Sequence, residues 1–155
     1  MNKVTIDRMD REILRLMQTE AEITAAAIGE RIGLSQSACW RRIQRLRTEG
    51  LILDQVVTLD REKAGFDAMI FAEVNLNSQG RSNINEFSEA IRSFPEVLDC
   101  YVLLGNVDFL LRIVTADIGA YEKFFFEKLS TLPGVHEIKS SIALTEIKHT
   151  MALPL

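Results

Sequence analysis

Residues 33–50 read GLSQSACWRRIQRLRTEG, and this stretch decides how the first third of the 155-residue chain is interpreted. A glycine is typical of the end of a helix, and a serine two residues later is typical of the start of the next one. Apolar residues then repeat at helical spacing until Gly50 ends the pattern. These inward-facing residues are Cys39, Ile43 and Leu46. The stretch therefore predicts a helix from about Ser35 to Glu49 that follows a tight turn.

The outer face of this helix is basic. Segment 35–49 carries four arginines and one glutamate, a local charge of +3, although the whole chain has 18 basic and 22 acidic residues and a net charge of −4. Two helices joined by a Gly-containing turn, the second rich in arginine, form the helix-turn-helix pattern. Arginine binds phosphate or guanine, and small polar groups at the helix start reach base edges. We predict DNA contacts from Ser35, Gln36, Ser37, Ala38, Arg41, Arg42, Gln44 and Arg45.

Two shorter helices are expected before it. Asp7 or Asp10 can cap the first helix, and Thr24 can cap the second. Gly29 falls inside the second helix, where glycine costs about 1 kcal/mol relative to alanine, and a close approach of two helices explains its presence. For Trp40, at the edge of the arginine face, packing is favoured over base contact. The alternative for the arginines is a solvated surface without a partner.

The rest of the chain changes its periodicity. Residues 51–59 alternate and predict one or two short strands, and Asp60–Gly65 predicts a turn at a domain joint. The elements expected after it are a strand Met69–Leu76, a helix Ser82–Phe94, strands Val97–Leu104 and Val107–Thr115, a helix from Asp117 to about Leu132, and a strand Val135–Lys148. This β-α-β-β-α-β order predicts a ferredoxin-like domain. The fold class is thus α+β, with a winged helix-turn-helix domain (1–60), a linker (61–67) and a ferredoxin-like domain (68–155).

The composition excludes several classes of protein. Hydrophobic residues make up 47% of the chain, with only 3 prolines and 8 glycines, which excludes intrinsic disorder. There is no run of about 18 apolar residues that predicts a membrane span, and the first residues lack the apolar core of a signal peptide. We therefore expect a cytoplasmic protein without a membrane partner. The two cysteines, Cys39 and Cys100, are too few for a disulfide framework and are expected to be reduced.

An enzyme is disfavoured by the residues that are present. The only histidines, His136 and His149, have no cysteine or carboxylate at metal-ligand spacing. The chain has no nucleotide-binding glycine motif and no G-x-S-x-G nucleophile motif. We expect no catalytic residue, no metal and no cofactor.

Motifs in both halves resemble one family. The first half has Ile6-Asp7-x-x-Asp10-x-x-Ile13-Leu14 and Cys39-Trp40-x-Arg42-Ile43-x-Arg45-Leu46, and the second has Gly105-Asn106-Val107-Asp108-Phe109 and Leu132-Pro133-Gly134-Val135. In this order they resemble the Lrp/AsnC family of leucine-responsive, or feast/famine, transcriptional regulators. The resemblance covers nearly the whole chain. The segments 140–144 and 152–155 also resemble a subgroup that regulates branched-chain or sulfur amino-acid breakdown.

The resemblance implies a regulatory second half that dimerises and binds a free amino acid. It further implies that dimers join into tetramers or octamers, with the effector between dimers. The positions implied for effector binding are Leu104, Gly105, Asn106, Asp108, Ser141, Ile142 and Ala143. Asp108 can pair with an ammonium group, and the glycine turn can bind a carboxylate through main-chain N–H groups. The alternative for Asp108 is a turn cap.

The leading hypothesis is a homo-oligomeric regulator that binds double-stranded DNA and senses a free amino acid. The alternative is an amino-acid-binding module that acts through protein contacts, and DNA binding through Arg41 and Arg45 separates the two. The run Phe124–Phe126 cannot face one core at helical spacing, so a subunit interface and a broad buried stripe remain equal interpretations.

Overall fold

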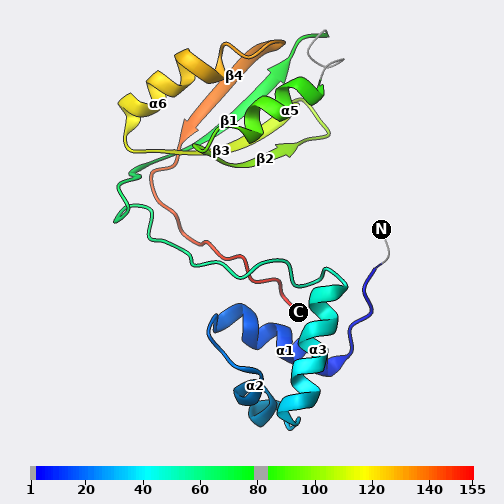
Figure 1. Ribbon diagram of the computed structural model, residues 1–155. Helices are drawn as coiled ribbons and strands as arrows, with labels where there is room; N and C mark the ends of the chain where they lie inside the picture. Colours follow the sequence, from blue (N-terminus) through cyan, green and yellow to red (C-terminus); the bar gives the residue numbers. More distant parts are fainter. Residues whose placement is uncertain (1–2, 79–83) are drawn as a thin grey trace. The chain divides into compact units, whose positions relative to one another are not determined.

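The computed structural model describes residues 3–78 and 84–155 (Figure 1). The chain forms two compact units. The first comprises Met1–Thr58 together with Lys148–Leu155, and the second comprises Leu59–Ile147. The division expected from the sequence placed the last eight residues with the second domain, whereas the structure places them with the first.

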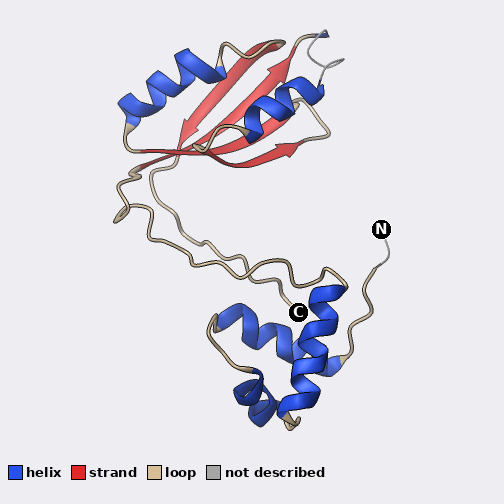
Figure 2. Ribbon diagram, in the orientation of Figure 1, coloured by secondary structure: helices blue, strands red, loops and turns tan. Residues whose placement is uncertain are grey.

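The described residues of the first unit form three helices (Figure 2). They are α1 (Arg8–Thr19), α2 (Ala25–Ile32) and α3 (Gln36–Thr48). Each begins at a polar side chain that accepts a main-chain hydrogen bond: Asp7 for α1, Thr24 for α2 and Ser35 for α3. The helices bury a common core in which the free thiol Cys39 packs with three isoleucines. The expected inward face of α3 is confirmed, because Cys39, Ile43 and Leu46 are all buried.

Gly29 lies in α2 at a point where the chain turns back on itself. A Cβ atom added there would lie 2.5 Å from the main-chain oxygen of Leu34. The amide of Leu34 donates to the carbonyl of Gly29 at 2.8 Å, and Gly33 between them has φ +72°. The close approach expected from the sequence is therefore present. It comes from the turn after α2, not from the body of a neighbouring helix.

The strands expected over residues 51–59 are not formed. All of these residues are described, and none belongs to a strand. A β-strand needs a hydrogen-bonded partner, which this segment lacks within the described chain. Most of its apolar side chains are therefore exposed to solvent, with Leu53 and Val57 more than 80% exposed, whereas Ile52 packs against the core of the helical unit. The helix-turn-helix is confirmed, but the wing is not formed as a sheet.

The second unit is a four-stranded antiparallel sheet with helices, so the expected β-α-β-β-α-β order is confirmed. Its elements are β1 (Ala68–Leu76), α5 (Ile84–Arg92), β2 (Val97–Val102), β3 (Phe109–Thr115), α6 (Ile118–Phe124), a π-helical turn (Phe125–Leu129) and β4 (Val135–Ile142). The strand order is β2-β3-β1-β4. The expected helix start at Ser82 lies outside the described residues.

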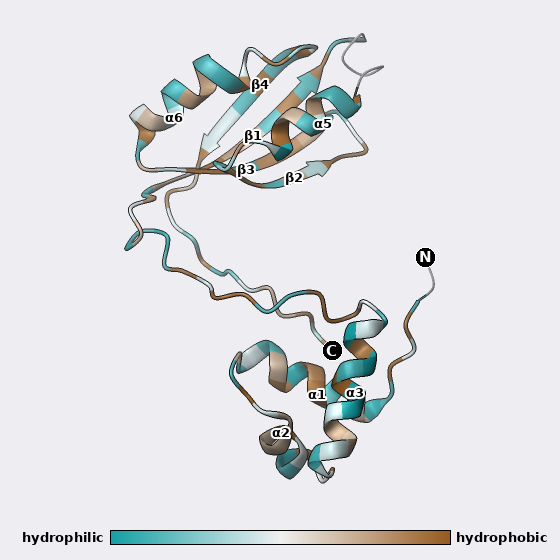
Figure 3. Ribbon diagram, in the orientation of Figure 1, coloured by the Kyte–Doolittle hydropathy of each residue, from teal (hydrophilic) through white to brown (hydrophobic). Residues whose placement is uncertain are grey.

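The core of this unit lies between the sheet and its helices. Phe87 of α5 stacks on Phe109 of β3 with ring centroids 4.4 Å apart. From Ile70 to Leu76, buried residues of β1 alternate with exposed or partly buried ones, as is typical of a sheet with one covered face. Figure 3 shows the hydropathy of the residues along the strands and helices of this unit. The opposite face carries Phe71, Tyr101 and the Arg112–Asp99 ion pair, and it is not covered within the described chain.

Several elements end earlier than the sequence predicts, and among them α5 ends at Arg92 instead of Phe94 and β2 at Val102 instead of Leu104. The helix after Asp117 changes into a π-helical turn at Phe125, which leaves Phe124 buried and Phe126 63% exposed. β4 ends at Ile142 instead of Lys148, because its partner β1 begins at Ala68 and the last main-chain bond joins Ala143 to Met69 at 2.9 Å. Beyond that point the chain has no strand to pair with.

Candidate DNA-binding and effector sites

The start of α3 presents small polar groups to solvent. The hydroxyl of Ser35 accepts from the amide of Ala38 at 3.2 Å and lies 3.3 Å from the hydroxyl of Ser37. Gln36, Ser37 and Arg41 are exposed, whereas Ala38 and Gln44 are partly buried. Among the described residues no carboxylate forms an ion pair with Arg41. The exposed start of the helix and this guanidinium are therefore available to a ligand.

Arg42 and Arg45 are held by carboxylates of α1. Arg42 donates from Nη1 to Asp7 at 2.7 Å and to Asp10 at 2.9 Å. Arg45 donates from Nη2 to the other oxygen of Asp10 at 2.6 Å. Asp10 is fully buried, so these partners compensate the cost of removing its charge from water. The helical wheel places both arginines correctly but does not reveal these bonds, because their partners lie more than 30 residues earlier in the sequence.

The same two aspartates cap α1. The side chain of Asp7 accepts from the amide of Asp10, and the side chain of Asp10 accepts from the amide of Asp7, which forms a reciprocal capping box. The Asp10 amide and then the Arg42 guanidinium lower the pKa of Asp7 below its usual range. The start of α1 and the middle of α3 therefore form one polar network.

Trp40 was expected to pack against the rest of the protein, but more than half of its surface is exposed to solvent. Its side chain is 55% exposed on α3, between Cys39 in the core and Arg41 on the surface. It is the only tryptophan in the chain. Its position beside the arginine face makes it a natural fluorescent reporter of whatever binds there.

The residues expected to bind an effector fall into two groups. Leu104, Gly105, Asn106 and Asp108 lie between β2 and β3. Here Asp108 acts as the turn cap considered from the sequence, because its carboxylate accepts from the amide of Leu76 at 2.8 Å. Its own amide donates to the side chain of Asn75 at 3.2 Å. A cap of this kind does not exclude a ligand, because a carboxylate accepts several hydrogen bonds.

The second group, Ser141 to Ala143, lies at the far end of the sheet. Ile142 pairs with Ile70, whereas Asp108 reaches Leu76 at the other end of β1. Six residues of strand separate these points, a distance of about 20 Å. One small amino acid therefore cannot contact both groups of a single chain. Ser141 faces away from the helices, because its neighbour Ser140 meets the hydroxyl of Tyr121 at 2.5 Å.

The sequence did not indicate two polar residues beside Asp108. Asn75, near the end of β1, donates to Glu137 of β4 at 3.3 Å. This bond, with a smaller contribution from Lys139, lowers the pKa of Glu137 below its usual range. A partly buried polar residue near the end of a largely apolar strand is the signal that could have identified Asn75.

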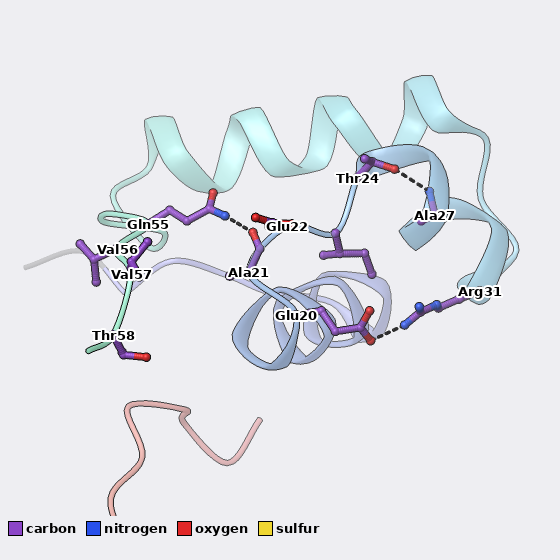
Figure 4. Close-up of a pocket in the computed structure, with 11 residues that line it drawn as sticks. Glu20, Ala21, Glu22, Thr24, Ala27, Arg31, Gln55, Val56, Val57 and Thr58 are labelled. Atoms are coloured by element: carbon purple, nitrogen blue, oxygen red, sulfur yellow. Dashed lines mark hydrogen bonds and ion pairs between the residues drawn. The ribbon is translucent and has the colours of Figure 1, made fainter. Parts of the chain in front are cut away.

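An open cavity of about 970 Å³ lies elsewhere, in the helical unit (Figure 4). It is lined by residues 20–24 with Ala27 and Arg31, and by residues 55–58. An ion pair between Glu20 and Arg31 lies at its edge, and the Gln55 side chain donates to the carbonyl of Ala21. None of the residues expected to bind DNA or an effector lines it.

Two further classes of site find no support in residues 3–78 and 84–155. No group of three or more histidine, cysteine, aspartate or glutamate residues there is arranged to hold a metal ion. None of the helices there combines the length and the apolar character that crossing a membrane requires.

A helix-turn-helix unit with a basic second helix, followed by a βαββαβ unit, defines a two-domain DNA-binding transcriptional regulator. The chain belongs to the Lrp/AsnC family, as expected. Residues 6–47 match the AsnC-type helix-turn-helix domain, and residues 69–153 match the Lrp/AsnC ligand binding domain. The chain is therefore a regulator and not an enzyme.

Relatives and solved structures agree with this assignment. The chain is 30% identical to the DNA-binding transcriptional activator DecR of Escherichia coli K12, over 97% of this chain and 99% of that protein. It is 34% identical to the transcriptional regulator AzlB of Bacillus subtilis, over 98% and 97%. A Neisseria meningitidis transcriptional regulator in complex with L-Met superposes with a TM-score of 0.92 at 33% identity, over 97% of both chains. An AsnC family regulator from Agrobacterium tumefaciens gives 0.90 at 36%, over 96% and 97%.

Proposed function

We propose that α3 reads double-stranded DNA and that a free amino acid, bound by the sheet unit between copies of the chain, modulates this binding. The observation that carries the first part is the exposed start of α3, with its two serine hydroxyls and the guanidinium of Arg41, which has no ion-pair partner in residues 3–78 and 84–155. The direct base contacts are assigned to Gln36, Ser37 and Arg41. Arg42 and Arg45 bind phosphate through N–H groups that Asp7 and Asp10 leave unused.

A matched pair of variants tests the DNA interface. Arg41→Ala is expected to lower the affinity for specific DNA about tenfold and to reduce the salt dependence by about one released ion. Arg47→Ala is the control, because Arg47 is also exposed on α3 but lies near its end. Equal binding by Arg41→Ala and the unaltered chain would reject the proposed interface. It would favour the alternative, a module that acts through protein contacts.

The separation of the two effector groups supports a site built by two copies. Asp108 provides a carboxylate for the ammonium group, and the turn at Gly105 provides main-chain N–H groups for the carboxylate. Ser141, Ile142 and Ala143 of a second copy complete the pocket. The relative solved with L-Met makes methionine the first amino acid to test.

The uncovered face of the sheet supports self-association. Phe71 and Tyr101 are 38% and 56% exposed on this face. A second copy that packs there buries both rings and the partly exposed Arg112–Asp99 pair. The proposed assembly is a dimer through this face, with dimers joined into a tetramer or an octamer by the shared effector site.

Light scattering with each of the twenty amino acids tests this assembly. A mass or melting temperature that changes with one amino acid supports the shared site. A monomer whose mass and melting temperature are constant under all twenty would reject both the dimer and the effector site.

A further inference from the structure

The last eight residues of the chain return to the helix-turn-helix unit and lie against α1 (Figure 1). Gln18 of α1 donates from its side chain to the carbonyl of Leu153 at 3.2 Å and accepts from the amide of Leu153 at 2.6 Å. One turn earlier, Arg15 donates to the main-chain oxygen of Leu155. The two contacts follow one face of the helix, because they are three residues apart.

The pairing between Gln18 and Leu153 is specific in its chemistry. A carboxamide carries both a donor and an acceptor, so it can satisfy both main-chain groups of one residue as a neighbouring strand would. Ala152 and Leu155 are partly buried, whereas Met151 and Leu153 are 78% and 65% exposed. The segment is therefore held by its main-chain hydrogen bonds and by the partly buried side chains of Ala152 and Leu155.

The segment continues directly from the strand that carries the second effector group. β4 ends at Ile142, and Ala143 makes the last bond to β1. Leu144 and Ile147 in the connection are 95% and 91% exposed. Only residues 144–147 therefore separate the proposed effector residues from the segment held on α1, and the exposed side chains of Leu144 and Ile147 show little packing along the way.

We propose that the outer face of α1 is the docking site of the chain's own C-terminal segment, residues 148–155. The docked segment is a second tether between the two units, in addition to residues 59–67. A unit attached at two points samples fewer orientations than a unit attached at one. An amino acid that binds at Ser141–Ala143 lies directly before the residues that lead to the docked segment. Its binding therefore changes the range of orientations in which α3 can bind DNA. This last step rests on the proposed effector function.

Cross-linking tests the docking without any effector. In a Cys100→Ser background, Gln18→Cys with Leu153→Cys is treated with a short bismaleimide. The control pair is Arg11→Cys with Leu153→Cys, because Arg11 lies two turns earlier on the same side of the exposed helix surface, about 10 Å away. We expect a cross-link within one chain for position 18 and several-fold less for position 11. Equal yields would overturn the docking, and a cross-link mainly between two chains would overturn docking within one chain.

The tether is tested by measuring DNA binding with and without L-methionine in the millimolar range. If only another of the twenty amino acids shifts the melting temperature, that amino acid is used instead. We expect the dissociation constant of the full chain to change at least fivefold with the effector, and less than twofold in a chain that ends at Ile147. Gln18→Glu, which loses the donor to Leu153, is expected to fall between them. Arg11→Gln, which makes the same change of charge at an exposed position two turns earlier on the helix, is its control. A truncated chain with the full response would overturn the tether. If no amino acid changes binding by the full chain, the effector function and the tether both fail, while cross-linking still decides the docking.

Discussion

The buried carboxylate of Asp10 binds the guanidinium of Arg45 at 2.6 Å and so joins the start of α1 to the middle of α3. The same carboxylate binds Arg42 through its second oxygen. Two of the four arginines of α3 therefore have fixed positions before any DNA arrives. Fixed side chains lose less conformational entropy on binding than mobile ones.

Replacement of Asp10 tests this network. Asp10→Ala leaves two guanidinium groups without their buried partner and removes half of the capping box, so the unfolding free energy is expected to fall by about 2–3 kcal/mol. This is less than the roughly 3–5 kcal/mol for a fully buried pair, because both arginines are partly exposed. Urea denaturation measures the loss. Glu12→Ala on the same helix, which breaks a surface pair with Arg15, is expected to cost less than about 0.5 kcal/mol. Equal losses would contradict a special role for Asp10.

The close approach at Gly29 makes a second prediction. Gly29→Ala places a methyl group 2.5 Å from the oxygen of Leu34, which is main chain and cannot rotate away. The resulting overpacking is expected to cost about 1–3 kcal/mol and to lower the melting temperature of the helical unit. Gly119→Ala is the control, because its new Cβ lies 3.3 Å from a side-chain oxygen of Asp117. An unchanged or raised melting temperature for Gly29→Ala would show that the turn adapts.

Two substitutions at Asp108 separate its capping role from its proposed effector role. Asp108→Asn keeps an oxygen that can accept from Leu76, so the fold is expected to persist while amino-acid affinity falls about tenfold or more with the lost charge. Asp108→Ala removes both the accepting oxygen and the charge, so it is expected to lower the melting temperature as well as the amino-acid affinity. Calorimetric titration with L-methionine and thermal unfolding measure the two effects. Unaltered amino-acid affinity in Asp108→Asn would assign Asp108 to the turn alone.

The depressed pKa of Asp7 predicts an acid dependence of stability. The amide of Asp10 and the guanidinium of Arg42 favour its ionised form in the folded state. The folded pKa is below the unfolded one, so this stabilisation is complete above the usual value of 3.8 and is lost as the pH falls through the folded pKa. Asp7→Asn is expected to flatten the decrease in melting temperature below about pH 4. An identical decrease in the variant and the unaltered chain would contradict this assignment.

Local patterns predicted the helices well. Thr24 and Ser35 each cap the helix they were expected to start, and of the two candidates for the first helix it is Asp7 and not Asp10 that caps it, because a cap depends on residues three positions apart. The order of strands and helices along the chain was predicted from the periodicity of the apolar residues. The ends of the strands were not, because β4 stops where β1 offers no more partners, and residues 51–59 have no partner strand in the described chain.

The sites were predicted less completely for the same reason. A helical wheel places Arg45 on the outer face of α3 but carries no information on Asp10, 35 residues earlier. The effector residues were grouped by family resemblance, and the sheet register then separates Asp108 from Ile142 along β1. The docking of Leu153 on Gln18 joins residues 135 positions apart, and the resemblance noted for segment 152–155 carries no information on its partner in α1.

The fluorescence of Trp40 gives the most direct measurement of the central claim, because this single tryptophan lies beside Arg41 on α3. The full chain is titrated with a DNA fragment selected from a random-sequence pool for binding to the chain and with a shuffled fragment of equal length, each with and without L-methionine. We expect a saturable change in emission, an affinity about a hundredfold higher for the selected fragment, an affinity that shifts with the amino acid, and a weaker change in Arg41→Ala. Equal affinity for both fragments, unaffected by Arg41→Ala, would contradict a DNA-reading role for α3.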